Sequence, residues 1–134
     1  MNKKIKYNPA DRFVCLVAVD EVSNSVIGVV DVSYLDEKEV LNILGPGTDG
    51  FVYIASMTVH ALWRRRGVAL ALLEAAKLVA REWNEGAAYL HVYQDNAAAI
   101  DLYKKHGFEI IFQDPSWLTM VGVRPRYLMR KGYT

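Results

Sequence analysis

Three consecutive arginines followed by a glycine give the chain its most distinctive chemistry. Residues 63–67 read Trp-Arg-Arg-Arg-Gly, after an apolar, β-prone stretch and directly before a helical pattern that begins at Val68. Such a turn presents backbone N–H groups at a helix N-terminus, where the helix dipole adds positive potential, and this suits a phosphate or pyrophosphate. Gly67 removes a Cβ where such a ligand would approach the backbone. A surface turn carrying three solvated arginines is the alternative, and this motif alone favours neither.

The elements next to the turn have a simple order. We expect a strand over Phe51–His60, a helix over Val68–Glu85 that ends at Gly86, and a strand over Ala88–Tyr93. Because the second strand follows the helix with almost no loop, the two strands should be parallel neighbours joined by a right-handed crossover.

The rest of the chain predicts further strands and one more helix. Residues 12–20 and 25–35 should pair as an antiparallel hairpin, with Gly28 marking a bulge or a close packing point. Residues 36–50 form a long connection whose first half can make a helical turn. The remaining expected elements are a helix over 97–106, a strand over 108–114, a loop with Trp117 over 115–122 and a strand over 124–131.

A second motif follows the helix–strand unit. Residues 96–108 read NAAAIDLYKKHGF, which resembles the signature Asn-x-x-Ala-x-x-Leu-Tyr-x-x-x-Gly-Phe of the GNAT superfamily of acetyl-CoA-dependent N-acetyltransferases. The matching positions are Asn96, Ala99, Leu102, Tyr103, Gly107 and Phe108. The turn also resembles that superfamily's pyrophosphate loop, through Arg64-x-x-Gly67-x-Ala69. The triple basic turn, DPSWLTMVGVRPR and the ending YLMRK resemble the plant plastid branch, which is known for acetylating protein N-termini and lysines.

The resemblance implies a fold and a domain arrangement. It implies a single α/β domain over residues 1–134, with a mixed, mostly antiparallel sheet and a splayed parallel strand pair at its centre. In the family a strand and two helices usually precede the hairpin and help to form the acceptor site. Only residues 1–11 precede the hairpin here, so we expect these N-terminal elements to be missing or shortened.

The resemblance also implies the roles of individual residues. Acetyl-CoA would be the co-substrate, and its pyrophosphate would bind the backbone amides of Arg65, Arg66, Gly67, Val68, Ala69 and Leu70. Backbone groups of Met57, Thr58 and Val59 would pair with the pantetheine arm, and one N–H would polarise the thioester carbonyl. Asn96 would cap its helix, contact the cofactor, or do both, and Tyr103 would protonate the leaving thiolate as general acid.

The general base is harder to assign. Many relatives use a glutamate on the strand that here reads Ala55-Ser56, where no carboxylate stands. His91 occupies a position where some protein N-terminal acetyltransferases of the superfamily place a glutamate, and an imidazole titrates near neutrality. His60 and a water chain without a dedicated base are the alternatives, while His106 reads as structural. The 36–50 and Trp117 loops are expected to flank the acceptor opening.

Composition narrows the possible partners. The net charge of +1 over 134 residues offers no broad basic excess for a nucleic acid. No apolar run is long enough to cross a membrane, and the three histidines lack metal-ligand spacing. Cys15 is the only cysteine, which excludes an intramolecular disulfide, and its apolar surroundings predict an inert core thiol.

Together these observations predict an acetyltransferase acting on an amine, most plausibly of a protein or peptide. We expect it to be soluble and intracellular, with a plastid location implied by the resemblance alone, and its oligomeric state stays open. A catalytically degenerate acyl-CoA-binding module is the alternative, supported by the shortened front and the absent strand glutamate. A simple phosphate-binding domain would leave the match at residues 96–108 without a role.

Overall fold

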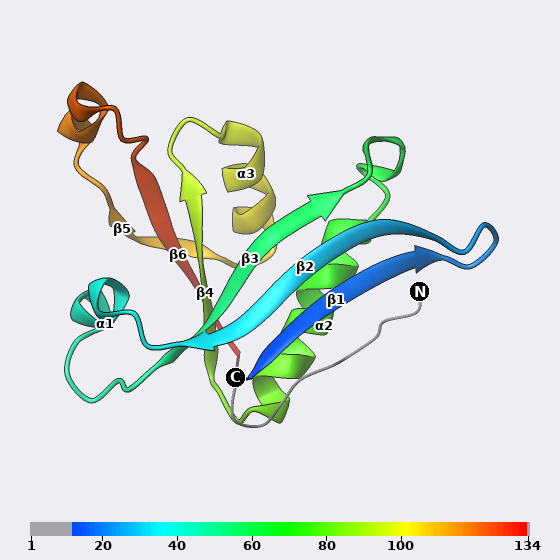
Figure 1. Cartoon of the computed structure of the whole chain (residues 1–134), viewed down its shortest axis with the longest axis horizontal. Helices are drawn as coiled ribbons and strands as arrows, with labels where there is room; N and C mark the ends of the chain where they lie inside the picture. The colour runs from blue at the N-terminus through cyan, green and yellow to red at the C-terminus, as the bar shows by residue number, and fades with distance from the viewer. Residues whose placement is uncertain (1–11, 134) are drawn as a thin grey trace.

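One mixed sheet forms the framework of the protein (Figure 1). The computed structural model describes residues 12–133. Its strands follow the order β1-β2-β3-β4-β6-β5 across the sheet. Their bounds are β1 Phe13–Asp20, β2 Ser25–Leu35, β3 Phe51–Val59, β4 Ala87–Tyr93, β5 Glu109–Gln113 and β6 Arg126–Gly132. The α-helices are α1 Lys38–Leu44, α2 Val68–Glu82 and α3 Ala97–Lys105, and short 3₁₀ helices cover Ala61–Trp63 (η1) and Ser116–Val121 (η2).

The two central strands, β3 and β4, run parallel and separate along their length. Their register contains two residue pairs, Val52–Ala88 and Tyr53–Tyr89, both near the beginning of the strands. Beyond these pairs β3 stays attached to β2, while β4 stays attached to β6 (Figure 1). A bulge accompanies the separation, because Ser56 adopts a left-handed φ of 56° and the β2–β3 register shifts nearby. The sheet is therefore open between β3 and β4 at their C-terminal ends.

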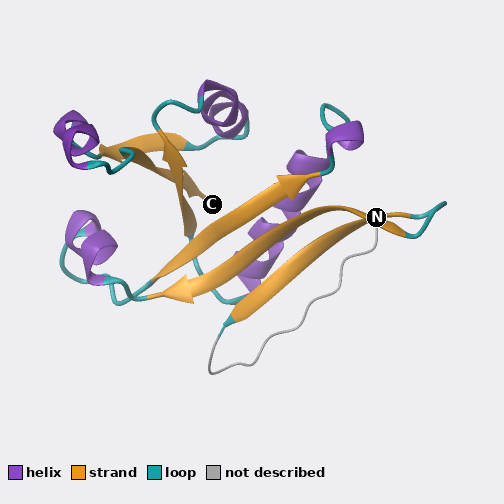
Figure 2. Ribbon diagram, turned by 45° about the horizontal axis from the view of Figure 1, so that its top comes forward, coloured by secondary structure: helices purple, strands orange, loops and turns teal. Residues whose placement is uncertain are grey.

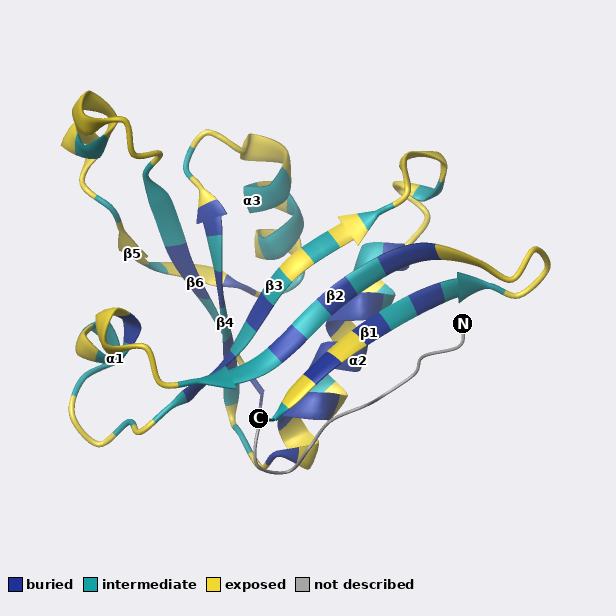
Figure 3. Cartoon of the chain, in the orientation of Figure 1, coloured by how far each residue is buried: buried dark blue, intermediate teal, exposed yellow. Residues whose placement is uncertain are grey.

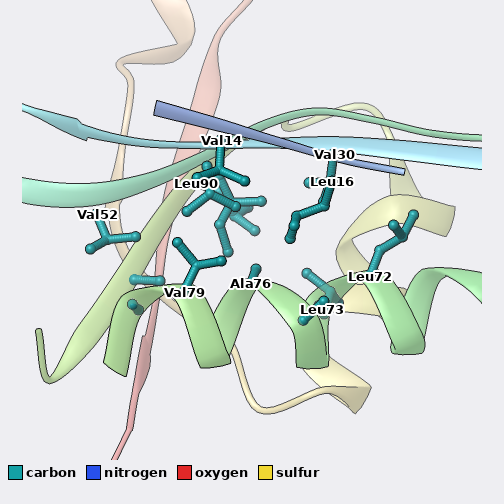
Figure 4. Packing of buried hydrophobic residues seen from close by; sticks show 14 of the residues in the cluster. Val14, Leu16, Val30, Val52, Leu72, Leu73, Ala76, Val79 and Leu90 are labelled. Carbon is teal, nitrogen blue, oxygen red and sulfur yellow. The ribbon is translucent and has the colours of Figure 1, made fainter. Parts of the chain in front are cut away.

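The main core lies between α2 and one face of the sheet. α2 packs against β1, β2, β3 and β4, and Figure 2 shows it crossing behind the long strands. Leu72, Ala76 and Val79 from the helix meet Val14 and Val30 from the first two strands (Figure 4). Every second strand residue reaches this core, as the strand period of two requires.

Gly28 brings the first turn of α2 close to the sheet. A Cβ on Gly28 would lie 2.9 Å from Val68 Cγ1 and 3.1 Å from Leu72 Cδ1, which is too close for an unshifted neighbour. The β1–β2 register also shifts beside this glycine, between Ala18 and Val19. Both expected roles of Gly28, a bulge and a close packing point, are confirmed. The consequence is that α2 begins close to the strands that surround the opening.

A smaller cluster fixes α1 on the opposite face of the sheet. Val40 is 2% exposed and packs with Phe51 and Leu128. Phe51 and Tyr53 belong to this cluster, whereas the alternate β3 residue Val52 belongs to the main core. The connection between β2 and β3 is thus folded onto the sheet, and its helical turn is longer than a single turn.

Most sequence-based expectations for the elements are confirmed, and two details are wrong. The crossover helix ends at Glu82 rather than Glu85, because Asn84 with a φ of 62° takes the left-handed position that Gly86 was expected to supply. Cys15 is exposed rather than buried, since it alternates with the fully buried Val14 and Leu16. Figure 3 shows this alternation as buried and exposed bands along β1. The expected loose segment at residues 1–10 and the expected shortening ahead of β1 lie outside the described residues.

Candidate active site

The basic turn ends at the uncapped N-terminus of α2, which follows β3 at the edge of the opening between β3 and β4. Gly67 is the N-cap of α2 with a left-handed φ of 79°, and it supplies no side-chain cap. The hydrogen bond that Gly67 accepts in the first turn of α2 comes from the Ala71 N–H, at 3.0 Å from the Gly67 carbonyl oxygen. The N–H groups of Val68, Ala69 and Leu70 precede that bond, so the helix geometry leaves them for an acceptor from outside. An anion is the acceptor that the helix dipole favours.

The arginines of the turn are exposed and partly ordered. Arg65 has a left-handed φ of 63°, which is uncommon for a residue with a side chain. Arg66 lies over the Trp63 ring at 5.1 Å from its centroid, and the Arg64 Nε donates to the Val59 carbonyl at 3.4 Å. His60 Nδ1 accepts the Leu62 N–H at 3.2 Å and so caps η1. This contact gives His60 a structural role at the start of the turn.

The end of β3 runs along the opening. Met57, Thr58 and Val59 follow the bulged Ser56, and Thr58 and Val59 pair with β2 on one side. Their register with β4 is absent in the described strands, because that pairing stops at Tyr53. This edge of β3 therefore has the extended geometry that an added strand or an extended ligand can pair with.

Helix α3 contributes Asn96 and Tyr103 at the other side of the opening. The Asn96 Oδ1 accepts the Ala99 N–H at 3.2 Å, which confirms the N-cap. Tyr103 packs against the main core, with its ring at 5.8 Å from the Phe108 ring in an edge-to-face arrangement. Burial raises the pKa of the Tyr103 phenol above its usual value, so the hydroxyl keeps its proton at neutral pH.

A tyrosine–histidine pair bridges the two central strands. The Tyr53 hydroxyl lies 2.6 Å from His91 Nδ1, and both side chains are half-buried. Burial lowers the pKa of His91 and raises the pKa of Tyr53, so both groups are neutral near pH 7.

Charged groups from three other elements surround His91. After burial, the Arg126 guanidinium on β6 is the next cause of its lowered pKa. The carboxylates of Asp114, after β5, and Glu39, on α1, oppose that change. The imidazole therefore has a cation and two anions as neighbours, and its proton affinity depends on all three.

A cavity of about 590 Å³ lies on the α1 side of the sheet, and it meets β4 at Tyr93, two residues after His91 on the same face of the strand. The lining residues are Glu39, Tyr93, Asp114, Leu118, Gly122, Val123, Arg124 and Arg126. The cavity is thus bounded by the connection between β2 and β3 and by the connection between β5 and β6. Trp117, which the sequence suggested as a loop marker, is 59% exposed and does not belong to the lining.

The wall formed by residues 115–125 is tied to β4. The Gln94 side chain donates to the carbonyls of Asp114 at 3.0 Å and Arg126 at 3.3 Å, which joins both ends of the connection. Arg124 Nη2 lies 2.7 Å from Asp95 Oδ1, and its guanidinium lies 3.7 Å above the Tyr93 ring. These contacts hold the wall in a fixed place at the end of β4.

The sequence-predicted site residues are brought together in part. The turn at 65–70 begins α2, the edge at 57–59 ends β3, and α3 with its cap Asn96 and with Tyr103 follows the end of β4, so these segments lie around the opening between β3 and β4 (Figure 1). His91 lies within β4, two residues before its end. Sequence reasoning missed Tyr53, Glu39, Asp114 and Arg126. The signal for Tyr53 was available, because strand alternation and the parallel β3–β4 pairing place it near His91. Glu39 and Asp114 come from connections whose paths the sequence does not show, and Arg126 is the first residue of β6.

Neither a metal cluster nor a membrane-spanning helix is part of this site. Among residues 12–133 there is no group of three or more histidine, cysteine or acidic side chains arranged to hold a metal ion. Within the same residues, no helix is both long and apolar enough to cross a membrane.

Comparisons with known proteins agree with the geometry. The sequence matches the Acetyltransferase (GNAT) family over residues 2–108. The chain belongs to this family. It is 36% identical over 138 residues to the Arabidopsis thaliana protein named GCN5-related N-acetyltransferase 10, chloroplastic. The match covers 98% of this chain and 54% of that protein, so the chain spans about half the length of this relative.

Solved structures of the family share the fold. Arabidopsis thaliana NAA60, solved in complex with a bisubstrate analogue, has a TM-score of 0.70 at 26% identity over 91% of this chain and 77% of that one. Nourseothricin acetyltransferase has a TM-score of 0.72 at 25% identity over 96% of this chain and 71% of that one. The α/β GNAT fold with its parallel β3–β4 pair is therefore established for this chain.

Proposed function

We propose that the 134 residues work as one acetyltransferase domain, which transfers an acetyl group from acetyl-CoA to an amine of a protein or peptide. The observation that carries this proposal is the opening between β3 and β4, with the uncapped N-terminus of α2 on one side and Tyr103 on the other. A thioester cofactor with a pyrophosphate fits this arrangement, because one end needs N–H donors and the other a proton donor.

Cofactor binding would use mainly backbone groups. The N–H groups of residues 65–70 would bind the pyrophosphate, and the exposed arginine side chains would add charge-assisted bonds. The edge at 57–59 would pair with the pantetheine arm, and Asn96 would keep α3 in place beside it. One N–H of that edge would polarise the thioester carbonyl, where negative charge develops.

Proton transfers would use Tyr103, His91 and Tyr53. The acceptor ammonium would lose a proton to the neutral imidazole of His91, directly or through the Tyr53 hydroxyl that contacts it at 2.6 Å. The amine nitrogen then bonds to the carbonyl carbon, the carbon–sulfur bond breaks, and the thiolate takes the proton of Tyr103. The extra proton on the acylated nitrogen would return to the Tyr103 phenolate, which leaves the amide, the free thiol and a protonated His91. The raised pKa of Tyr103 suits this role, because the phenol is fully protonated before each turnover.

The acceptor class is supported by relatives and by shape. NAA60 was solved with a bisubstrate analogue, and the cavity at the end of β4 is lined partly by exposed residues such as Glu39 and Arg124, so a polypeptide end or side chain can reach it from solvent. The Arabidopsis relative is named chloroplastic, which supports a plastid location for this protein. Protein N-termini and lysine side chains are accordingly the acceptors we propose.

The test is peptide-dependent release of free thiol from acetyl-CoA, compared between the wild type and Tyr103→Phe. General acid catalysis contributes about 10²- to 10⁴-fold, so the variant should lose at least about a hundredfold in kcat while its affinity for acetyl-CoA stays unchanged. Equal rates in the two proteins would remove Tyr103 from the chemistry.

A catalytically degenerate acyl-CoA-binding module is the second candidate. The absence of a carboxylate at Ala55-Ser56, where many relatives have their base, is the observation in its favour. Under this alternative, acetyl-CoA would raise the melting temperature of the wild type, yet no peptide would cause thiol release. Mass spectrometry of the peptides after incubation separates the two candidates directly.

A further inference from the structure

Glu39 stands at the wall of the cavity that faces the β5–β6 connection. It lies on α1, and the adjacent Val40 is buried against Phe51 and Leu128. The side chain of Glu39 is exposed, but its backbone is therefore anchored to the sheet by its neighbour. A carboxylate is thus held at the cavity by packing and not by a mobile loop.

The other charged residues of the cavity lining already have partners. Arg126 Nε lies 3.7 Å from Asp114 Oδ2, and the Arg126 backbone N–H donates to the same oxygen at 2.9 Å. Arg124 is paired with Asp95 at 2.7 Å. Among residues 12–133, Glu39 is the charged lining residue for which no ion pair is formed. A negative charge is therefore left for a ligand.

The charge of Glu39 reaches the proposed proton acceptor. The groups that face His91 are Tyr53 from β3, Arg126 from β6, Asp114 after β5 and Glu39 from α1. Of the two carboxylates, Asp114 also faces Arg126, whereas Glu39 approaches from the opposite wall. The cavity that Glu39 lines meets β4 at Tyr93, which is on the same face as His91 two residues earlier, so a cation bound by Glu39 would lie on the side of the sheet from which the imidazole is reached.

We propose that Glu39 binds the ammonium group of the acceptor, and thereby selects aliphatic amines of polypeptides that arrive protonated. This inference rests on the proposed function and names the acceptor recognition of the same site. Lysine side chains, and a large part of chain N-termini, carry a proton at neutral pH. Glu39 holds that cation at the cavity until His91 removes a proton, after which the neutral amine is free to attack.

The experiment compares two forms of one peptide on the CoA-bound protein. The first form has a free N-terminus and one lysine, and the second has both amines acetylated, so that it carries no ammonium group. Glu39→Gln should weaken binding of the free peptide about fivefold, as expected for one partly solvated ion pair, and leave the acetylated peptide unchanged. Asp36→Asn is the matched control, since it removes the same charge from the same connection without lining the cavity.

Turnover gives a second readout that a structural role would not produce. In Glu39→Gln the KM for peptide should rise about fivefold and the KM for acetyl-CoA should not change. The acidic limb of kcat/KM should move to lower pH, because the Glu39 carboxylate raises the pKa of His91 and the variant lacks that effect.

Each remaining outcome is decisive. Equal binding of the free peptide by the wild type and Glu39→Gln would overturn the proposal, and so would an equal loss in Asp36→Asn. A wild type that binds both peptide forms alike would overturn it as well. If the wild type binds the free peptide but releases no thiol, the proposed function fails, while the binding comparison still decides the role of Glu39.

Discussion

The two sides of the opening are built in different ways. On the side proposed for the cofactor, one short segment supplies a left-handed Gly67 and the first N–H groups of α2, and these are consecutive in sequence. On the side proposed for the acceptor, Glu39, Tyr53, His91 and Arg126 come from four separate elements. Backbone groups dominate the first side and side chains dominate the second.

This difference bears on how each side of the opening would tolerate substitutions. A backbone site tolerates many side chains as long as the turn and the helix start keep their shape. A site made of separate side chains changes with each substitution, so acceptor preference can differ while the cofactor stays the same. The two sides should accordingly respond to different substitutions, and the expected effects can be ranked.

Apart from Tyr103→Phe, the largest effect should come from removing the Tyr53 hydroxyl. Tyr53→Phe breaks the 2.6 Å contact with His91, and we expect kcat/KM for peptide to fall about a hundredfold, a typical loss for an impaired proton transfer. Affinity for acetyl-CoA, measured by calorimetry, should stay unchanged. Tyr89→Phe is the matched control, because Tyr89 lies two residues before His91 on β4 and its hydroxyl accepts from Arg130 Nε instead. A similar loss in both variants would contradict a specific role for Tyr53.

A smaller effect, confined to the cofactor side, is expected for Gly67→Ala. A left-handed alanine costs about 1 kcal/mol of stability, and its methyl group would occupy the space where the pyrophosphate approaches. Affinity for CoA should fall about tenfold for this change, since 1.4 kcal/mol is one factor of ten. Gly122→Ala is a close control: Gly122 has a φ of 80°, and as at Gly67 an added Cβ would meet nothing within 4 Å.

Gly122→Ala should therefore lose similar stability without losing affinity for CoA, as measured by thermal unfolding and calorimetry. If both glycine variants bind CoA equally well, the turn is not where the pyrophosphate binds. The proposal that backbone groups of this turn bind the cofactor would then be wrong.

The smallest effect concerns stability against pH. The pKa of His91 is lowered by burial, so the unfolded chain binds more protons than the folded one just below the usual histidine pKa near 6.5. The free energy of unfolding should decrease as the pH falls from about 6.5 through the lowered pKa, and this part of the decrease should vanish in His91→Asn. Urea titrations at several pH values measure it, and identical pH slopes in the two proteins would contradict a buried neutral His91.

The features that depend on local geometry could be predicted from the sequence. The order of elements, the parallel β3–β4 pair, the helix start at Val68 and the Asn96 cap depend on residues close together in the chain, and all four are confirmed. The identification of Tyr103 and His91 as chemical groups stays a prediction, because no measurement of turnover bears on it.

Side chains that depend on distant contacts were harder to predict. Glu39 reaches the cavity because Val40 finds a place against Phe51 and Leu128, and this packing is not visible in the local pattern. Cys15 was placed in the core because its neighbours are apolar, although strand alternation points it to the other face. In both cases the decisive information was the direction of a side chain relative to the sheet.

The contacts of Gln94 suggest how the two walls of the cavity could change independently. Its side-chain amide clamps both ends of the β5–β6 connection, so residues between Asp114 and Arg126 can be exchanged or lengthened while the anchor points stay fixed. The wall that carries Glu39 depends on the apolar fit of Val40 and can be altered without touching that clamp. The β5–β6 connection can thus be exchanged as an insert, whereas α1 is held by packing. Substitutions in either one offer a separate way to change the acceptor that we propose for this cavity.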